Sequence, residues 1–416
     1  MVPRYANFAF LQQRCLVKQY NSYLATGTDE HGQKIVRNYH QNKFKYDSID
    51  DFVDSIASEY RSQFEKMRIS VDERDGGRFT RTTDEKHKKS AIKMWNKIKH
   101  NIKLEEHEGW YSYNDEVFVP ETKQIIDEKT GKRYAADSMH ELELVAEENY
   151  FFDFSEYLDG IELYIRTAVK TTNIKKLLNE IEQYRKDPSK AKLCVSRPNK
   201  RMIVSNDRTW GVPVPTNPPS HQMYVWFEAL CSYITSIENE ETGKLSMWPI
   251  TLQVVGVDIL NFHAIYLPAI LLAAEMPLPR ALLVHGHWTN NGEKMGKSKA
   301  NYISFDEMSD VVNGQVDAIR WFLLSNLSGS NKNYSPELLR IMTDRNLGQI
   351  LTRAFDQATS EENNPYQTYP HFDEDSAANL LTLQEVGVEA SISDVILCVA
   401  CERSQKTSRS LRAKSE

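Results

Sequence analysis

Three short apolar runs that stop at a glycine constrain the fold of this chain more than any other feature. Residues 23–26, 251–255 and 281–285 predict buried strands, a glycine follows each of them, and helical patterns lie between them. Strands that alternate with helices predict a parallel sheet covered by helices on both faces. Ligands bind such sheets outside the carboxyl ends of the strands, so functional residues are expected beside these glycines.

Helical periodicity fills most of the intervals between these strands. Apolar residues recur three and four positions apart in residues 48–67 and 84–102, which predicts two amphipathic helices. Further helices are predicted from about Gln33 and over residues 174–185, 261–274, 316–324 and 336–355. A short strand is expected at 69–71, and the alternation of aromatic and polar residues between 109 and 154 predicts a small β-rich insertion.

The composition is that of a soluble globular protein. Of the 416 residues, 40% are hydrophobic and 26% are charged, which is enough apolar material for a sizeable core. The net charge of −7 argues against a protein whose whole surface coats nucleic acid, and no DNA partner is expected. The longest apolar run, residues 265–274, is too short to cross a bilayer, so no membrane partner is expected.

The five cysteines predict neither a disulfide framework nor a metal centre. They are scattered, and Cys398 and Cys401 form a CxxC pair without the two further ligands that a zinc site needs. The first 28 residues hold no acidic side chain, which is typical of a targeting segment and equally of the outer face of a helix; we favour the helix. The sequence carries no sign of an oligomeric state.

Two segments place polar or aromatic residues where a ligand could bind. Asp29 follows the first strand in the run TGTDEHG, where a carboxylate either binds an ammonium group or caps the next helix. Trp226, Ala229 and Tyr233 share one face of a predicted helix. Such a face either holds a flexible apolar ligand, since a thioether packs well on aromatic rings, or belongs to the core.

A third segment follows the strand that stops at Gly256. Gly256 and Asp258 form a strand–glycine–aspartate turn that suits a ribose hydroxyl, and Ile259 and His263 lie one helical turn apart just beyond it. The alternative is a capped helix with a satisfied histidine.

The fourth segment is the most specific of the four. Lys294 and Lys297 lie three residues apart in a glycine-bearing loop after a strand, which suits a mobile clamp on polyphosphate; the alternative is a solvated turn. Neither a P-loop nor a GxGxxG motif is present, which disfavours the commonest kinases, NTPases and dehydrogenases.

Taken in order, these segments resemble the methionyl-tRNA synthetases, a family of class I aminoacyl-tRNA synthetases. Residues 294–298 are similar to the family's KMSKS loop, and residues 26–32 match its TGTDEHG motif. Three more stretches follow in the family's order, at 210–215, 224–233 and 258–268. The resemblance runs from about Cys15 to about Phe355. It implies a Rossmann-like α/β fold with a parallel sheet, a β-rich connective insertion and a helical C-terminal region.

The resemblance implies a role for each matching residue. Asp29 would bind the α-ammonium group of methionine. The pocket for the methionine side chain would be formed by Trp226, Ala229, Tyr233, Ile259 and His263. Gly256 and Asp258 would contact the adenosine of ATP. The ATP phosphates and the departing pyrophosphate would be held by Lys294, Lys297 and Ser298.

The implied activity is that of a methionine–tRNA ligase, with methionine, ATP and tRNA(Met) as partners. Methionine would be activated by ATP in the presence of Mg²⁺ and then transferred to the 3' end of the tRNA. Residues 100–190 hold no cysteine, so no structural zinc is expected, and the insertion resembles the metal-free form of mitochondrial members. A mitochondrial matrix location is therefore expected, with the cytoplasm as the alternative.

The resemblance also implies a division of the chain into five parts. These are the first half of the catalytic core (1–104), the connective insertion (105–193) and the second half of the core with the KMSKS-like loop (194–305). A helical region (306–358) and a poorly ordered tail (359–416) follow.

Some residues depart from the family pattern. No HIGH motif precedes Thr26, so the first strand is expected to be missing and the chain to be truncated at both ends. Gly296 replaces the KMSKS serine, and Val257 stands where the family usually has lysine. The main alternative is an inactive paralogue that binds methionine, tRNA or a protein partner. A synthetase for another apolar amino acid is disfavoured by the Trp226 and Tyr233 pocket and by the short insertion.

Overall fold

The structure, a computed structural model, describes most of the chain up to residue 344. The described residues are 23–69, 71, 77–113, 115–136, 138–205, 208–216, 220–239, 242–243, 245, 247–295, 301–325 and 330–344. The chain divides into two compact units, one comprising Pro3–His287 with Ser328–Asn331 and the other Trp288–Leu327 with Lys332–Glu416. Within the described part, no helix combines the length and apolar character needed to cross a membrane.

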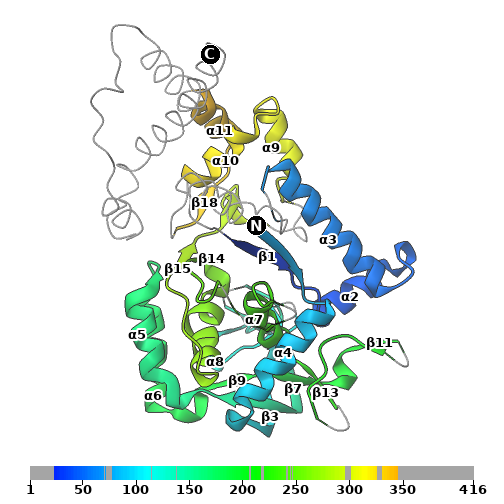
Figure 1. Ribbon diagram of the computed structural model, residues 1–416. Helices are drawn as coiled ribbons and strands as arrows, with labels where there is room; N and C mark the ends of the chain where they lie inside the picture. Colours follow the sequence, from blue (N-terminus) through cyan, green and yellow to red (C-terminus); the bar gives the residue numbers. More distant parts are fainter. Residues whose placement is uncertain are drawn as a thin grey trace. The chain divides into compact units, whose positions relative to one another are not determined.

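Parallel strands form the centre of the first unit (Figure 1). β1 (Leu24–Thr28) pairs in parallel with β2 (Gly77–Arg81). A second parallel group has the order β14 (Gln253–Gly256), β15 (Leu282–His285) and β8 (Val169–Lys170). The predicted α/β architecture with parallel strands is confirmed. The strand registers place Thr28 beside Arg81, and Gly256 beside His285, at the carboxyl ends.

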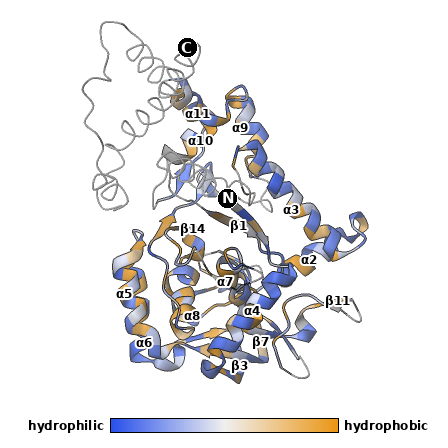
Figure 2. Cartoon of the chain, in the orientation of Figure 1, coloured by the Kyte–Doolittle hydropathy of each residue, from blue (hydrophilic) through white to orange (hydrophobic). Residues whose placement is uncertain are grey.

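Helices connect and cover these strands. Between β1 and β2 the chain forms α2 (Gln33–Asn42), the short 3-10 turn η1 (Lys43–Lys45) and α3 (Ile49–Lys66). The core of the unit lies among five helices: α4 (Glu85–Ile98), α5 (Leu158–Ala168), α6 (Ile174–Lys186), α7 (Val225–Thr235) and α8 (Leu267–Ala273). Its inner side chains interlock; the Trp95 and Phe227 rings of α4 and α7, for example, meet edge to face at 5.7 Å. Figure 2 shows α8 largely hydrophobic, whereas α4 carries hydrophilic residues.

The predicted β-rich insertion is an antiparallel sheet. Its two long strands, β3 (Ile102–Ser112) and β7 (Glu143–Asp153), pair along their whole length. β4 (Val117–Phe118) and β9 (Lys192–Cys194) extend the sheet on either side, and β5 (Gln124–Ile126) pairs with β6 (Arg133–Ala135). Short 3-10 turns connect these strands and the flanking helices: η3, η4, η5 and η6, at Lys99–Asn101, Glu121–Lys123, Ser155–Tyr157 and Pro188–Lys190.

Shorter elements complete the first unit on both sides of α7. Two antiparallel pairs precede it: β10 with β13, at Ser196–Pro198 and His221–Met223, and β11 with β12, at Ile203–Ser205 and Arg208–Thr209, with η7 at Asn199–Arg201. After β14 come the 3-10 turn η8 (Val257–Ile259) and the π-helical turn η9 (Phe262–Tyr266), which leads into α8.

The second unit combines a small sheet with helices. β16 (Trp288–Asn290) lies between β17 (Glu293–Lys294) and β18 (Lys332–Asn333). The helices are α9 (Phe305–Val311), α10 (Val316–Ser325) and α11 (Pro336–Met342). α9 begins with a capping box, because Ser304 accepts from the Glu307 backbone N–H and the Glu307 side chain accepts from that of Ser304.

The strand predicted at 69–71 is wrong. Ile69 instead caps α3: Arg68 has a positive φ of 54°, and the Ile69 N–H bonds to the carbonyl of Phe64 at 2.9 Å. This is a Schellman-type helix end, in which the apolar residue after the left-handed position packs back on the helix, and Ile69 is buried accordingly. In the helix predicted over 336–355, α11 ends at Met342; residues 345–355 and the tail at 359–416 lie outside the described residues.

Candidate active site

The loop after β1 forms one wall of the candidate site. Gly32 ends this loop with a φ of +97°, and a Cβ there would lie only 2.5 Å from a carboxylate oxygen of Glu116, so the position requires glycine. The Asp29 side chain reaches solvent, although protein surrounds it on most sides. This burial among other groups, together with the negative charges of Glu228 and Glu116, raises the pKa of Asp29 well above its usual value.

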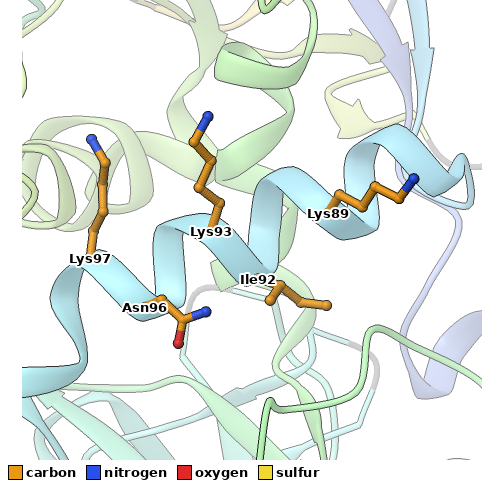
Figure 3. Close-up of a pocket in the computed structure, with 5 residues that line it drawn as sticks. All are labelled: Lys89, Ile92, Lys93, Asn96 and Lys97. Carbon is orange, nitrogen blue, oxygen red and sulfur yellow. The ribbon is translucent and has the colours of Figure 1, made fainter. Parts of the chain in front are cut away.

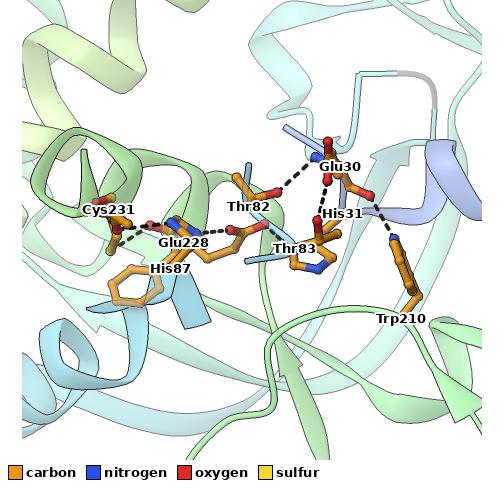
Figure 4. Close-up of polar contacts among 10 residues, drawn as sticks. Glu30, His31, Thr82, Thr83, His87, Trp210, Glu228 and Cys231 are labelled. Carbon is orange, nitrogen blue, oxygen red and sulfur yellow. Dashed lines mark hydrogen bonds and ion pairs between the residues drawn. The ribbon is translucent and has the colours of Figure 1, made fainter. Parts of the chain in front are cut away.

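Glu30, next to Asp29, has a structural role. Its Oε1 accepts hydrogen bonds from the Thr28 hydroxyl at 2.6 Å and from Arg81 Nε at 2.8 Å. The Thr83 hydroxyl donates to its other oxygen, and Trp210 Nε1 donates to its backbone carbonyl at 2.8 Å (Figure 4). These contacts fix the loop to β2, so that Asp29 is the carboxylate of the loop that a ligand can reach.

Glu228 on α7 joins three elements in the interior of the first unit. Its carboxylate is fully buried and accepts from His31 Nδ1 at 3.0 Å and from His87 Nε2 at 2.6 Å (Figure 4). Burial alone would raise the pKa of Glu228, but the charges and hydrogen bonds of the two histidines outweigh it and hold the pKa below its ordinary value. The β1 loop, α4 and α7 are thereby held in one arrangement.

Tyr233, Ile259 and His263, three of the predicted pocket residues, are joined by hydrogen bonds. His263 Nδ1 lies 2.9 Å from the Ile259 carbonyl oxygen, which can only accept, so this nitrogen carries the proton. Its Nε2 can then accept from the Tyr233 hydroxyl, which lies 2.7 Å away. This chain fixes the Tyr233 ring of α7 against the η8 and η9 turns.

Trp226 and Ala229 extend the same face of α7, and both are half-buried. The Trp226 ring stacks on Phe262 with centroids 3.7 Å apart and planes 12° apart. Phe262 was not among the predicted pocket residues, yet it precedes His263 and supplies the second aromatic plane. The predicted methionine-binding residues of α7 and η9 are thus neighbours, as the predicted pocket requires; their roles remain predictions.

The residues predicted to bind adenosine lie at the end of β14. Gly256 is the last residue of this strand and is buried, and Asp258 is exposed in η8 directly after it. This is the carboxyl edge of the parallel group, where ligands bind open sheets. Both residues thus lie at an edge where a ligand could bind, and their contact with adenosine stays a prediction.

The predicted phosphate clamp belongs to the second unit and is described only in part. The backbone of Lys294 lies in β17, opposite Thr289 of β16, across a turn whose Asn291 and Gly292 have positive φ. The Gly292 N–H donates to the Asn333 side chain at 2.9 Å, which fixes the turn to β18. The Lys294 side chain, and all of Lys297 and Ser298, lie outside the described residues.

Comparison with known proteins identifies the family. Residues 10–349 match the sequence model of the family described as tRNA synthetases class I (M). The chain belongs to this family. The methionyl-tRNA synthetase resemblance and the class I fold expected from the sequence are both confirmed.

Individual relatives of the chain support the same grouping. Methionine–tRNA ligase 1 of Bacillus anthracis is 36% identical over 364 residues, covering 84% of this chain and 52% of the relative. The mitochondrial methionine–tRNA ligase of Saccharomyces cerevisiae is 36% identical over 338 residues, covering 73% and 56%. The Mycobacterium tuberculosis methionyl-tRNA synthetase bound by methionyl-adenylate superposes with a TM-score of 0.72 at 26% identity, covering 91% of this chain and 72% of that one. The chain spans about half the length of these two curated relatives.

Sequence reasoning missed one buried cation of the chain, Arg197. The guanidinium is 3% exposed, lies 4.1 Å above the Tyr111 ring and has its Nε 3.1 Å from a Glu147 oxygen. Burial opposes its charge, but Tyr111 and Glu147 more than offset this, and its pKa is raised. An arginine inside the short run 194–198 is the signal that could have found it, because arginine is rarely buried without a partner.

Sequence reasoning also missed the Glu228 network, although the spacing of His87 already placed it on the buried face of a predicted helix. His87 lies four residues before Ala91 and eight before Trp95, so it falls on the inner face of α4. No metal centre accompanies these histidines: within the described part of the synthetase, no three His, Cys, Asp or Glu side chains are arranged to hold a metal ion. The expected absence of zinc stays a prediction.

Proposed function

We propose that this synthetase is a methionine–tRNA ligase that activates methionine with ATP and transfers it to tRNA(Met). One observation carries the proposal: an accessible carboxylate, Asp29, lies in an acidic environment linked through Glu228 to the aromatic face of α7. A ligand that suits both features needs a cationic group and a flexible apolar side chain. Methionine has both. The solved Mycobacterium tuberculosis relative holds methionyl-adenylate, which supports the same substrate.

The acidic environment favours an ammonium group. Glu228 and Glu116 make ionised Asp29 costly in the free protein. A bound α-ammonium group offsets these negative charges and restores the ionised form.

The α7 face would hold the methionine side chain. Trp226, Tyr233 and His263 offer aromatic surfaces on which a thioether packs well. Ala229 leaves room between them, and Ile259 closes the pocket from η8. An apolar pocket of this kind distinguishes a ligand from one lacking a methylene by only about 1–3 kcal/mol.

The reaction would proceed in two steps. A carboxylate oxygen of methionine attacks the α-phosphorus of ATP, which is bound as its Mg²⁺ complex; the new O–P bond forms as the bond to pyrophosphate breaks. The adenosine would rest on Gly256 and Asp258. Lys294 and Lys297 would offset the charge on the leaving pyrophosphate, and the Ser298 hydroxyl would donate a hydrogen bond to the phosphates. A ribose hydroxyl of the tRNA then attacks the methionyl carbonyl, AMP leaves with the bonding electron pair, and the hydroxyl proton passes to solvent.

The experiment that tests the function is methionine-dependent exchange of pyrophosphate into ATP by the purified chain, with Lys297→Ala as control. We expect exchange above the control, with leucine and valine inactive. The competing function is that of an inactive methionine-binding paralogue. Calorimetric binding of methionine by a folded chain that shows no exchange would establish that competitor and overturn the ligase.

We also propose that the protein works in the mitochondrial matrix. The absence of cysteine from residues 100–190 and the similarity to the yeast mitochondrial ligase support this location, whereas the bacterial relatives are equally similar. Immunodetection in fractionated cells of a eukaryotic source is the test. The protein is expected in the mitochondrial fraction, and a purely cytosolic signal would contradict the proposal.

A further inference from the structure

Helix α4 and the turn after it concentrate positive charge in an acidic protein. Residues 85–103 hold seven lysines and a single acidic residue, Glu85, whereas the whole chain has a net charge of −7. The buried face of α4 anchors the helix in the core through residues such as Trp95 and Ile98. The lysines are therefore presented on a fixed scaffold, not on a loop.

Three of these lysines form a regular row, which we call the lysine stripe: Lys89, Lys93 and Lys97. They are spaced by four residues, all three are exposed, and successive ones are about 6 Å apart along the helix axis. Lys93 pairs with Glu238 and keeps 57% of its side chain exposed. Among the residues that the structure describes, Lys89 and Lys97 form no ion pair with a carboxylate.

The stripe borders a hollow in the surface. The hollow has a volume of about 490 Å³ and is lined by Lys89, Ile92, Lys93, Asn96 and Lys97 (Figure 3). Lys93 and Lys97 project to the same side of α4 on successive turns (Figure 3). Beside the three ammonium groups, the Asn96 amide offers neutral hydrogen-bond donors.

The chemistry of this surface fits a nucleic acid backbone better than a protein or a membrane. Its one apolar side chain, Ile92, is too little for membrane insertion, and it offers no aromatic anchor of the kind that dominates protein interfaces. Lysine and asparagine are typical phosphate ligands, and lysines spaced by about one helical turn can reach successive phosphates of one strand. Such contacts position an RNA without reading its sequence.

We propose that the lysine stripe of α4 binds the phosphate backbone of the tRNA substrate. This inference rests on the proposed function for the identity of the RNA. The stripe contributes to RNA affinity and has no part in methionine activation, because none of its residues is among those assigned to methionine or ATP.

The test compares Lys89→Ala/Lys97→Ala with a matched control, Lys175→Ala/Lys176→Ala, which removes two exposed lysines from α6 of the same unit. Both variants of the full chain are titrated with a transcript of a methionine-accepting tRNA at several salt concentrations. For the stripe variant we expect Kd to rise at least about fivefold and the slope of log Kd against log salt to fall by about 1.5–2. The control should match the parent in both quantities.

Two further measurements separate the possible failures. The melting temperatures of both variants should equal that of the parent, because the substituted side chains are exposed. Pyrophosphate exchange without tRNA tests the proposed function by itself, and both variants should retain the parent's rate. If the stripe variant and the control bind the transcript with the same Kd and salt slope, the inference is wrong even where exchange is normal. If the parent shows no exchange, the proposed function fails while the RNA comparison still decides on the stripe.

Discussion

The carboxylate of Glu228 is buried and ionised, and hydrogen bonds from two histidines stabilise its charge. A buried carboxylate that loses its partners costs several kcal/mol, but one that accepts two charge-assisted hydrogen bonds is held firmly in place. The same residue precedes Ala229 on the helix that presents the predicted methionine pocket. Its bond to His31 therefore sets the distance between that pocket and Asp29, and its bond to His87 sets the position of α7 against α4.

The substitution Glu228→Gln tests this role. We expect the free energy of unfolding at pH 7 to fall by about 2–4 kcal/mol, because the amide cannot accept from both histidines. We also expect KM for methionine to rise more than kcat falls, because the hydrogen bond that joins α7 to the loop of Asp29 is lost. Urea denaturation and exchange kinetics measure the two effects. Glu85→Gln, which breaks the exposed pair with Lys88, is the control and should change neither.

The stability effect at Glu228 has a definite pH dependence. The folded-state pKa is lowered, so the carboxylate stabilises the fold above its unfolded pKa of about 4.3, and the stabilisation is lost as the pH falls through the lower folded value. Parent and Glu228→Gln should therefore converge in stability below about pH 4. A difference that persists undiminished at pH 3 would show that packing, not charge, produces the effect.

Asp29 presents the opposite case, a carboxylate whose charge opposes folding. Its folded pKa is raised, so its ionisation destabilises the fold increasingly as the pH rises above the unfolded value of about 3.9. We expect Asp29→Asn to stabilise the free protein at pH 8 by no more than about 1 kcal/mol, because the accessible side chain keeps part of its hydration. The gain should vanish near pH 3. Methionine binding, followed by calorimetry, should be lost; a variant that binds normally would remove Asp29 from the site.

At the scale of elements, the close pairing of β1 with β2 depends on Gly27. A Cβ at this position would lie 1.8 Å from the backbone carbonyl oxygen of Thr80, which cannot rotate away. We expect Gly27→Ala to lower the free energy of unfolding by about 3 kcal/mol or more, since the two strands must separate. Gly131→Asn is the control, because its site is open and asparagine tolerates the φ of +71°. Equal melting temperatures of the two variants would contradict the β1–β2 register.

The same elements show how far the sequence predicts this fold. β1, β14 and β15 could be predicted because each is an apolar run bounded by glycine, and α3 and α4 because their apolar residues repeat with the helical period. β2 could not, because Phe79 is its one large apolar side chain and its place depends on the pairing with β1. Ile69 misled because an apolar residue after a helix serves a strand or a cap equally well.

The candidate site divides in the same way. Asp29, Trp226 and Tyr233 are visible in the sequence because each follows a local rule of spacing or of strand ends. Glu228 and its two histidines lie 197 and 141 residues apart along the chain, so nothing local announces that they meet. Local patterns can thus nominate residues for direct ligand contact, whereas the residues that would position them emerge only from the tertiary structure.

At the scale of the whole molecule, each of the two compact units carries its own set of predicted site residues. The described residues assigned to methionine, from Asp29 to His263, belong to the first unit, and the predicted phosphate clamp belongs to the second. A ligand stabilises the part that it contacts, by about 2.7 kcal/mol at a hundredfold excess over Kd. Methionine and ATP should therefore protect different parts of the chain.

Hydrogen exchange followed by mass spectrometry resolves this difference. With saturating methionine alone we expect slower exchange in peptides from β1, α7 and η9, and unchanged exchange in α9 and α10. Adding the Mg²⁺ complex of a non-hydrolysable ATP analogue should extend protection to β14 and to residues 288–304, because the phosphates engage the lysine loop. Asp29→Asn should abolish the first pattern and leave protection by the nucleotide alone intact, since Asp29 contacts only the amino acid. Protection of α9 and α10 by methionine alone would show that the amino acid is bound by residues other than those assigned. The expectation that methionine and ATP protect different parts of the chain would then be wrong.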